Sequence, residues 1–340
     1  MTARLITVFG GNGFVGRHVV QRLANAGNRV RVACRDPEAA LFLKPLGNPG
    51  QIVTVKANLT DKDEVARAIE GSDAIVNCAG VIASKGWNTL EAVHKSGSAI
   101  LAKACTAAGI KTLVHLSALG ADLRAPSVYA QTKAHGEEAI LGAFPKATIL
   151  RPALIIGSED NFMNMFATIA RWSPIIPMIN PVLPSLKMVR GELFDVAMPA
   201  LQPRPLEGAS FQPVVVGDVA QAVVNAIDNA DAKGQTYDVT GPTAYTFKRL
   251  MEMMLDASGR KACIMSLPAF WAHYWAFWFE LIPTKPFTRD MVTLLNHDNL
   301  PTGENKSLAD LGVEAHSIES VLPSYLNTYR PPSNRRLRPV

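Results

Sequence analysis

Three side chains in the middle of the sequence have the types and spacing of an acid–base centre. Ser117 ends a predicted strand, Tyr129 begins a predicted helix, and Lys133 stands four residues beyond the tyrosine. Residues i and i+4 share one helix face, and a neighbouring ammonium lowers the pKa of a phenol. In an active protein, Tyr129 would exchange protons with a substrate. A lone YxxxK pattern is common, so its meaning depends on the rest of the chain.

The stretch VFGGNGFVGRH predicts a nucleotide-binding loop. Its spaced glycines, Gly10, Gly13 and Gly16, follow an apolar run and precede an amphipathic helix. Glycine allows a tight turn and lets backbone N–H groups approach a pyrophosphate at a helix N-terminus. A turn that merely needs glycine is the alternative interpretation. The loop residues expected at the cofactor are Gly10, Asn12, Gly13, Phe14, Val15, Gly16 and Arg17.

The residues after the second predicted strand favour NADPH over NADH. In NAD-binding proteins an Asp or Glu at this place binds the ribose hydroxyls. Here the first polar side chain is Arg35, a cation suited to a 2′-phosphate, and Arg17 can add a second cation. Two alternatives remain open: Arg35 as a solvated loop residue, and Asp36 as the ribose ligand.

Two later strand ends fit the same ligand. Asn58 and Leu59 follow the third strand, where a polar residue can reach the adenine edge. The fourth strand ends in small residues that let a cofactor pass close to the backbone. The residues expected there are Cys78, Ala79, Gly80 and Val81. His18 and His94 read as ordinary helix residues and His115 as a packing residue. No spacing of His, Cys, Asp and Glu indicates a metal site.

Alternating strand and helix patterns must position these residues. Six apolar segments are predicted to be buried strands: LITVFG, RVRVAC, QIVTVKAN, DAIVNCAG, KTLVHLSA and ATILRPALIIG. Helices are expected over residues 14–26, after a Thr60 cap, over residues 89–108, and after Asp218 as a cap. Strands separated by helices form parallel sheets through right-handed crossovers. The pattern predicts an α/β protein with a Rossmann-type doubly wound parallel sheet.

A smaller, mostly irregular and helical C-terminal lobe is expected beyond Gly157, because residues 172–213 carry many prolines. The predicted divisions are an NADP-binding domain over residues 1–157, completed by 211–242. The smaller lobe takes residues 158–210 and 243–330, and a basic tail takes residues 331–340.

The composition is that of a globular protein. Of 340 residues, 48% are hydrophobic and 19% charged, which excludes a disordered chain. The net charge of +5 suits anionic cofactors, acidic proteins or anionic membranes, and it is too diffuse to indicate nucleic acid. The four cysteines form no CxxC pair and are expected to be buried, reduced thiols. We expect no targeting peptide at the N-terminus and no membrane-spanning segment.

Several segments together resemble an extended, atypical short-chain dehydrogenase/reductase. More narrowly, the chain resembles the NADPH-binding accessory subunits of respiratory complex I and their bacterial relatives. The resemblance extends over nearly the whole chain and is most specific in the segments ILRPALIIGSEDNFMNMFA and FQPVVVGDVAQAV. The segment between Pro181 and Phe211 is longer than the family pattern leads us to expect.

The resemblance implies a tightly held NADPH with a structural role. By position, the glycines would take the pyrophosphate and Arg35 the 2′-phosphate. Tyr129, Lys133, Pro152 and Ala153 would line the nicotinamide end. The partners would be other complex I subunits, at the cytoplasmic face of a bacterial inner membrane or the matrix side in mitochondria. The alternative is an active NAD(P)H-dependent reductase, or an enzyme like nucleotide-sugar epimerases and dehydratases, that uses Ser117, Tyr129 and Lys133.

The segment LPAFWAHYWAFWFELI, residues 267–282, is apolar nearly all round but too short to span a bilayer. It reads either as a buried helix of the second lobe or as a surface for a membrane or partner. Trp and Tyr favour the membrane interface, and Lys285 and Arg289 follow closely enough to meet lipid head groups. Residues 267–289 are therefore a candidate membrane contact, with the buried helix as the open alternative.

Overall fold

The computed structural model describes residues 3–331, apart from 85, 181–206, 283–284 and 286. Its main layer is an eight-stranded parallel sheet in the order β14-β11-β6-β5-β4-β1-β2-β3. The strands are β1 (Leu5–Phe9), β2 (Arg29–Cys34), β3 (Ile52–Lys56), β4 (Ala74–Asn77), β5 (Leu113–Leu116), β6 (Thr148–Pro152), β11 (Thr236–Val239) and β14 (Lys306–Ser307).

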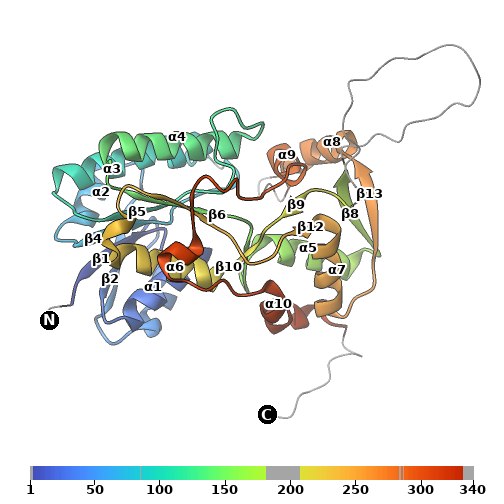
Figure 1. Ribbon diagram of the computed structural model, residues 1–340, viewed down its shortest axis with the longest axis horizontal. Coiled ribbons are helices and arrows are strands. Elements are labelled where there is room, and N and C mark those ends of the chain that lie inside the picture. The colour runs from blue at the N-terminus through green and yellow to red at the C-terminus, as the bar shows by residue number, and fades with distance from the viewer. Residues whose placement is uncertain (1–2, 85, 181–206, 283–284, 286, 332–340) are drawn as a thin grey trace, which may run out of the picture.

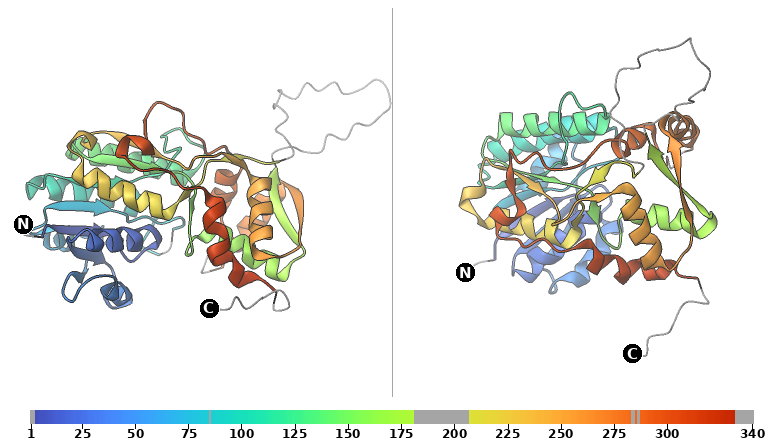
Figure 2. Two further views of the ribbon diagram at one scale, coloured as in Figure 1. Left: turned by 60° about the horizontal axis from the view of Figure 1, so that its bottom comes forward. Right: turned by 45° about the vertical axis from the view of Figure 1, so that its right-hand side comes forward.

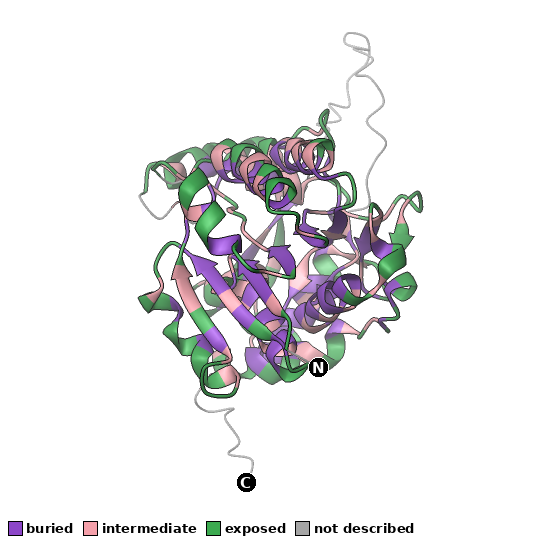
Figure 3. Ribbon diagram, turned by 90° about the vertical axis from the view of Figure 1, so that its left-hand side faces the viewer, coloured by how far each residue is buried: buried purple, intermediate pink, exposed green. Residues whose placement is uncertain are grey.

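Helices cover both faces of this sheet, which explains why its central strands are continuous apolar runs (Figure 1). Every residue of β4 and β5 is buried, and the sheet forms the interior of the layer in Figure 3. On one face lie α1 (Phe14–Asn25) and α6 (Val216–Asp228). On the other lie α2 (Lys62–Ile69), α3 (Ser98–Ala107) and α4 (Val128–Ala143). The predicted doubly wound fold is confirmed.

The strand order reverses at β1, which lies between β2 and β4. In doubly wound sheets, ligands bind at the carboxyl ends of the strands beside such a reversal. Gly10 follows β1 and Asn77 ends β4, so the predicted glycine loop and the small-residue segment both lie at this edge.

The rest of the chain forms a second lobe beside the sheet (Figures 1 and 2). Its core brings together α5, α7 and α10 around Phe166, Phe247 and Leu322. Two-stranded pairs join β8 to β13, β9 to β12, and β7 to β10. The helices are α5 (Asn161–Trp172), α7 (Phe247–Ser258), α8 (Ala269–Glu280), α9 (Arg289–Leu295) and α10 (Ile318–Leu326). The strands are β7 (Ile155–Ile156), β8 (Ile175–Asn180), β9 (Ser210–Phe211), β10 (Val214–Val215), β12 (Tyr245–Thr246) and β13 (Cys263–Pro268).

The helical character expected of this lobe is confirmed, and the proline-rich residues 172–213, predicted as irregular structure with short elements, include the short strands β8 and β9. Residues 175–180 form β8 despite Pro177, because among the described residues β8 pairs with β13 alone, so its other edge needs no N–H donor there. The long segment between Pro181 and Phe211 lies largely outside the described residues, as does the basic tail after residue 331.

Two predicted helix caps are wrong. The cap of α2 is Asp61, not Thr60: the Asp61 carboxylate accepts from the backbone N–H groups of Asp63 and Glu64. Asp218 lies inside α6 rather than before it. Its buried carboxylate instead accepts hydrogen bonds from the backbone N–H and ring Nδ1 of His316, at 2.8 and 2.7 Å.

The helix expected over residues 89–108 is present, with a π-helical segment at Ala92–Gly97 (η2) that leads into α3. Such π-segments often occur at functional sites. The cysteines are all free thiols, but the prediction that all are buried is wrong: Cys263 is exposed and Cys78 only partly buried. Within the described ranges, no helix has the length and apolar character to cross a membrane.

Candidate functional site

The glycine loop between β1 and α1 is shaped for close backbone approach. Gly10 has a φ of +69°, and a Cβ placed there would lie 2.8 Å from the Cα of Ala79. A Cβ on Gly16 would overlap the carbonyl of Gly10 and lie 2.6 Å from the Cα of Gly11. Helix α1 has Gly13 as its N-cap residue, with no capping side chain and no acidic residue in its first turn. An uncapped helix N-terminus of this kind suits an anion such as a pyrophosphate.

Arg35 and Asp36, at the end of β2, are in contrasting situations. Arg35 is exposed and forms no hydrogen bond or ion pair with the described part of the chain. The Asp36 carboxylate accepts from the backbone N–H groups of Glu38 and Ala39, at 3.0 and 3.2 Å. Asp36 therefore caps the next turn, whereas Arg35 is free to meet an anion.

Arg17, the second expected cation, is engaged within the protein. Its guanidinium lies 3.6 Å from the Glu159 carboxylate and 5.0 Å above the Phe42 ring. Asn58 and Leu59 also have local roles. The Asn58 side chain accepts from the Thr60 N–H, and Leu59 is buried in the core beneath α2 and α3.

The predicted acid–base residues lie together at the ends of β5 and α4. Lys133 is buried, and its Nζ donates to the Leu116 carbonyl at 3.1 Å and lies 5.9 Å from the Tyr129 ring centroid. The Ser117 hydroxyl is buried and has no hydrogen-bond partner among the described residues. We call the site formed by Ser117, Tyr129 and Lys133 the nicotinamide end, after the cofactor part predicted to lie there. Pro152 and Ala153 follow at the end of the adjacent strand β6, where the Pro152 carbonyl accepts from the Leu119 N–H.

The predicted lowering of the Tyr129 pKa is wrong for this structure. Burial raises the pKa of Tyr129 to about 12, and the same loss of water lowers the pKa of Lys133 to about 8. The Lys133 ammonium lies at a distance from the phenol ring at which its attraction does not outweigh this desolvation. Without a ligand, the phenol stays protonated at neutral pH.

Two histidines that the sequence analysis treated as structural residues belong to this site. His94, in the π-segment, accepts from the Val81 N–H through Nε2 at 3.1 Å and lies 3.0 Å from the Thr132 hydroxyl through Nδ1. Because Nε2 accepts, Nδ1 must carry the proton. The ring also packs edge-on against Tyr129 at 5.5 Å. The sequence spacing between His94 and the predicted motifs does not indicate this position, because the contacts of His94 form only in the folded chain.

His115 is held as a neutral ring by Asn77. The Asn77 side chain accepts from the Ala79 N–H, so its NH₂ group donates to Nδ1 of His115 at 3.0 Å. The other ring nitrogen, Nε2, is a buried donor without a partner among the described residues. Burial and the nearby Lys133 charge lower the pKa of His94 to about 2 and of His115 to about 3.

The unpaired Ser117 hydroxyl and His115 Nε2 are buried polar groups that are costly to leave without hydrogen bonds. They lie two residues apart, at the end of β5 and just after it. Together with the uncapped α1 and the free Arg35, they fit a dinucleotide that passes from β2 across the glycine loop to β5. Within the described residues, no cluster of three or more His, Cys, Asp or Glu side chains is placed to hold a metal ion.

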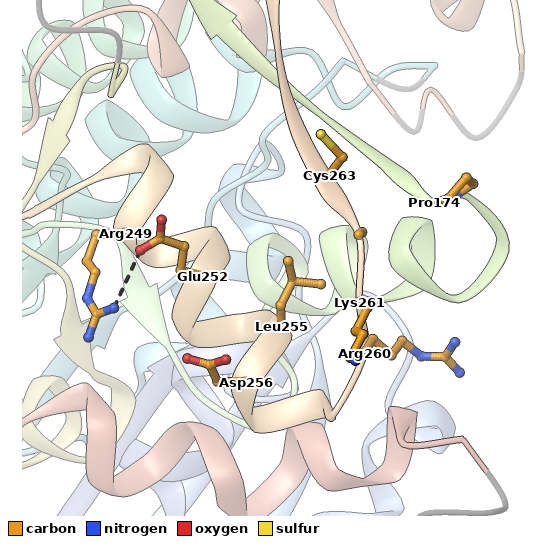
Figure 4. Close-up of a pocket in the computed structure, with 9 residues that line it drawn as sticks. Pro174, Arg249, Glu252, Leu255, Asp256, Arg260, Lys261 and Cys263 are labelled. Atoms are coloured by element: carbon orange, nitrogen blue, oxygen red, sulfur yellow. Dashed lines mark hydrogen bonds and ion pairs between the residues drawn. The ribbon is translucent and has the colours of Figure 1, made fainter.

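A depression on the second lobe is unrelated to these residues. It lies between α7 and the start of β13, and its lining mixes Arg249 and Glu252 with Asp256 and the exposed Cys263 (Figure 4). Arg249 and Glu252 face one another across one helix turn, so their charges offset each other. None of the predicted cofactor residues lines it.

Comparison with known proteins agrees with the fold and the glycine loop. A family described as NAD(P)H-binding matches residues 10–160. The UDP-glucose 4-epimerase of Thermus thermophilus, solved in complex with NAD, superimposes with a TM-score of 0.68 at 18% identity. That alignment covers 96% of this chain and 98% of the epimerase, and shows the fold. The molecule is therefore a Rossmann-fold protein, and its residues 10–160 match an NAD(P)H-binding family.

Sequence relatives narrow this class. Subunit 9 of the NADH dehydrogenase [ubiquinone] 1 alpha subcomplex from Mus musculus is 30% identical, over 92% of this chain and 77% of that protein. The same subunit from Arabidopsis thaliana is 30% identical, over 95% and 77%. The chain belongs to the family of these complex I alpha-subcomplex subunit 9 proteins.

Proposed function

We propose that this protein holds NADPH, in preference to NADH, along the carboxyl edge of its sheet, as an accessory subunit of a complex I-type respiratory enzyme. The observation that carries the cofactor preference is the contrast between Arg35 and Asp36. One oxygen of the carboxylate that would bind ribose hydroxyls is engaged in capping, whereas the exposed guanidinium is free for a 2′-phosphate.

The proposed contacts follow the strand order. The loop from Gly10 to Gly16 takes the pyrophosphate, with Asn12, Phe14, Val15 and Arg17 around it. Asn58 and Leu59 border the adenine, and the segment Cys78–Val81 borders the middle of the cofactor. Ser117, Tyr129, Lys133, Pro152 and Ala153 line the nicotinamide end. We propose the same domain limits as the sequence predicts, with residues 1–157 and 211–242 forming the nucleotide-binding part.

A mainly structural role is supported by the protonation states at the nicotinamide end. Acid–base catalysis is most effective when the catalytic pKa lies near the working pH. The pKa of Tyr129, at about 12, is far above neutrality. The family membership points the same way, because the relatives named above are subunits of an assembly.

Helix α8 supplies the proposed membrane contact. Seven aromatic side chains on this helix are between 40% and 53% exposed, far more than scattered surface residues provide. We call them the aromatic face: Phe270, Trp271, Tyr274, Trp275, Phe277, Trp278 and Phe279. Trp and Tyr are the side chains that concentrate at the boundary of a bilayer. We propose that this face lies on the lipid surface, on the cytoplasmic side in a bacterium or the matrix side in a mitochondrion.

The two cations expected to meet lipid head groups have partners within the protein. Lys285 Nζ donates to the Ser84 carbonyl at 3.0 Å, and Arg289 pairs with Glu280 at 2.9 Å. The proposed contact with lipid therefore depends on the aromatic rings and not on these two charges.

Purification from native membranes tests this function. A tagged chain extracted with mild detergent is expected to bring complex I subunits with it and to release about one NADP(H) per chain on denaturation. A chain that purifies alone, or that carries NADH or no nucleotide, would contradict the proposal.

A second candidate function is favoured by one observation, the position of Tyr129 and Lys133 of α4 beside Ser117 at the end of β5. In a reductase, NADPH held here would supply the hydride that reduces a carbonyl carbon. Tyr129 would give its proton to the carbonyl oxygen, Ser117 would donate a hydrogen bond to that oxygen, and Lys133 would position the tyrosine. Steady NADPH oxidation with an aldehyde, ketone or quinone, abolished in Tyr129→Phe, would establish this activity. NADPH that none of these compounds oxidises would exclude it for those classes.

A further inference from the structure

A carboxylate from the second lobe caps the helix that carries Tyr129. Asp290 lies in α9, 161 residues from Tyr129, and α9 adjoins α4 in space (Figures 1 and 2). One Asp290 oxygen accepts from the Val128 N–H at 2.7 Å. The other accepts from the Tyr129 N–H and the Ser127 hydroxyl, both at 3.0 Å. Two segments remote in the sequence thus meet at the first turn of α4.

These bonds complete the hydrogen bonding at the N-terminus of α4. The Ser127 hydroxyl accepts weakly from the Ala130 N–H at 3.4 Å, and the Gln131 N–H donates to the Ser127 carbonyl. Without Asp290, the N–H groups of Val128 and Tyr129 would lose their acceptors. A negative charge at this position also interacts favourably with the dipole of α4. Asp290 therefore fixes the backbone of the turn on which the Tyr129 side chain stands.

The segment that carries Asp290 is itself firmly attached. The Glu280 carboxylate, at the end of α8, accepts from the Arg289 backbone N–H at 2.8 Å and from its Nε at 3.0 Å. Val292 is fully buried with Ala272 and Ala276 of α8. Lys285 donates to Ser84, in the loop that follows the small-residue segment after β4. The second lobe thus holds both chain segments that frame the nicotinamide end.

We propose that Asp290 is a positioning residue for the nicotinamide half of the cofactor. The inference rests on the NADPH site proposed above. Asp290 sets the position of Tyr129, and through α4 that of Lys133, one turn further along. The adenosine half depends on the glycine loop and Arg35, and among the described residues neither forms a hydrogen bond or ion pair with α9. Loss of the carboxylate therefore weakens the hold on nicotinamide and leaves the hold on adenosine unchanged.

Two ligands separate these halves in a binding experiment with Asp290→Ala. Adenosine 2′,5′-bisphosphate has the adenine and the 2′-phosphate but no nicotinamide, whereas NADPH has both ends. By calorimetry, we expect the variant to bind NADPH about 10-fold more weakly than wild type, since charge-assisted bonds that set the site are lost. Binding of the bisphosphate should stay within about 2-fold. The fluorescence of bound NADPH should also shift toward that of the free nicotinamide.

Two further variants separate positioning from general stability. Asp290→Asn keeps one acceptor for the Val128 N–H and should be intermediate. Asp310→Ala removes another capping carboxylate, which binds the Ser307 N–H and hydroxyl far from the site. It should lower the melting temperature without changing either affinity. If Asp290→Ala fails to fold, the Asp290→Asn measurement decides.

Equal weakening of both ligands, or no weakening of NADPH, in a folded Asp290 variant would overturn the positioning role. A wild-type chain that binds neither ligand would instead refute the proposed NADPH site. A wild-type chain that binds both with equal affinity would show that the nicotinamide half makes no contribution for Asp290 to support, which also overturns the inference.

Discussion

At the nicotinamide end polar side chains are buried, whereas along α8 aromatic side chains are exposed. Lys133 and Ser117 are 5% and 3% exposed, while Trp271, Trp275 and Trp278 are each about half exposed. Both arrangements cost free energy in an isolated chain: unpaired polar groups inside, apolar surface outside. The difference fits the two contacts proposed above, a dinucleotide along the sheet edge and an apolar surface against the second lobe. Binding at one should be separable from binding at the other.

The sharpest separation comes from the glycine loop. In Gly16→Val the new side chain would collide with Gly10 and Gly11 and fill the space that a pyrophosphate needs. We expect NADPH affinity to fall at least about 1,000-fold, or about 4 kcal/mol, with membrane binding retained. Gly142→Ala is the matched control, because a Cβ at Gly142 meets nothing within 4 Å. Retained NADPH binding in Gly16→Val, measured by calorimetry, would place the cofactor elsewhere.

The reverse separation comes from the aromatic face. Replacing Trp271, Trp275 and Trp278 by serine removes much of the exposed apolar area of α8. Binding to vesicles of phosphatidylglycerol and phosphatidylcholine should weaken about 100-fold, or about 3 kcal/mol, while NADPH affinity stays unchanged. The matched control is Trp172→Ser on α5, an 81% exposed tryptophan outside this face. If wild-type vesicle binding is absent but complex I subunits still co-purify, the face contacts a protein partner.

A substitution at Arg35, at the adenosine end of the proposed cofactor site, should change nucleotide affinity without changing membrane binding by α8. Arg35→Ala removes a cation that has no partner within the described protein, so the folded state loses nothing that holds it together. NADPH affinity should fall about 30-fold, or about 2 kcal/mol, with NADH affinity unchanged. Arg124→Ala, at a 94% exposed side chain, is the control. A similar loss for both nucleotides would show that Arg35 does not read the 2′-phosphate.

Local patterns in the sequence predicted the sheet, the glycine loop and the pairing of Tyr129 with Lys133. These features depend on short spacings, which a helix or strand translates directly into geometry. The cap that Asp290 provides to α4 depends instead on residues 161 positions apart, and no spacing reveals it. The same holds for the bonds of His94 to Val81 and Thr132.

The sequence could not predict two properties that depend on burial, the pKa of Tyr129 and the exposed side of α8. The lowered pKa expected for Tyr129 rested on the nearness of Lys133, and desolvation, which depends on the whole fold, reversed it. The sequence likewise left α8 open between a core helix and a surface, since its aromatic residues suit both. The packing of Ala272 and Ala276 against Val292 shows that a narrow side of α8 is buried.

The smallest expected effect tests whether the polar groups of the nicotinamide end are truly held neutral. Burial lowers the pKa of His115 from 6.5 to about 3. Below pH 6.5, the ring is therefore protonated in the unfolded chain and stays neutral in the folded chain. The free energy of unfolding must then fall as the pH drops, by up to about 1.4 kcal/mol per pH unit for this residue.

The variant His115→Asn keeps an acceptor for Asn77 and removes this pH-dependent contribution to stability. The difference in unfolding free energy between the variant and wild type should therefore shift in the variant's favour by about 1 kcal/mol between about pH 6.5 and 5.5, measured by urea titration. The control is His135→Asn, at a partly exposed histidine beside Glu138, where no such burial acts. An unchanged difference for His115→Asn would mean that water or a counter-charge reaches the ring, and the contrast between a buried polar site and an exposed aromatic face would then lose its physical basis.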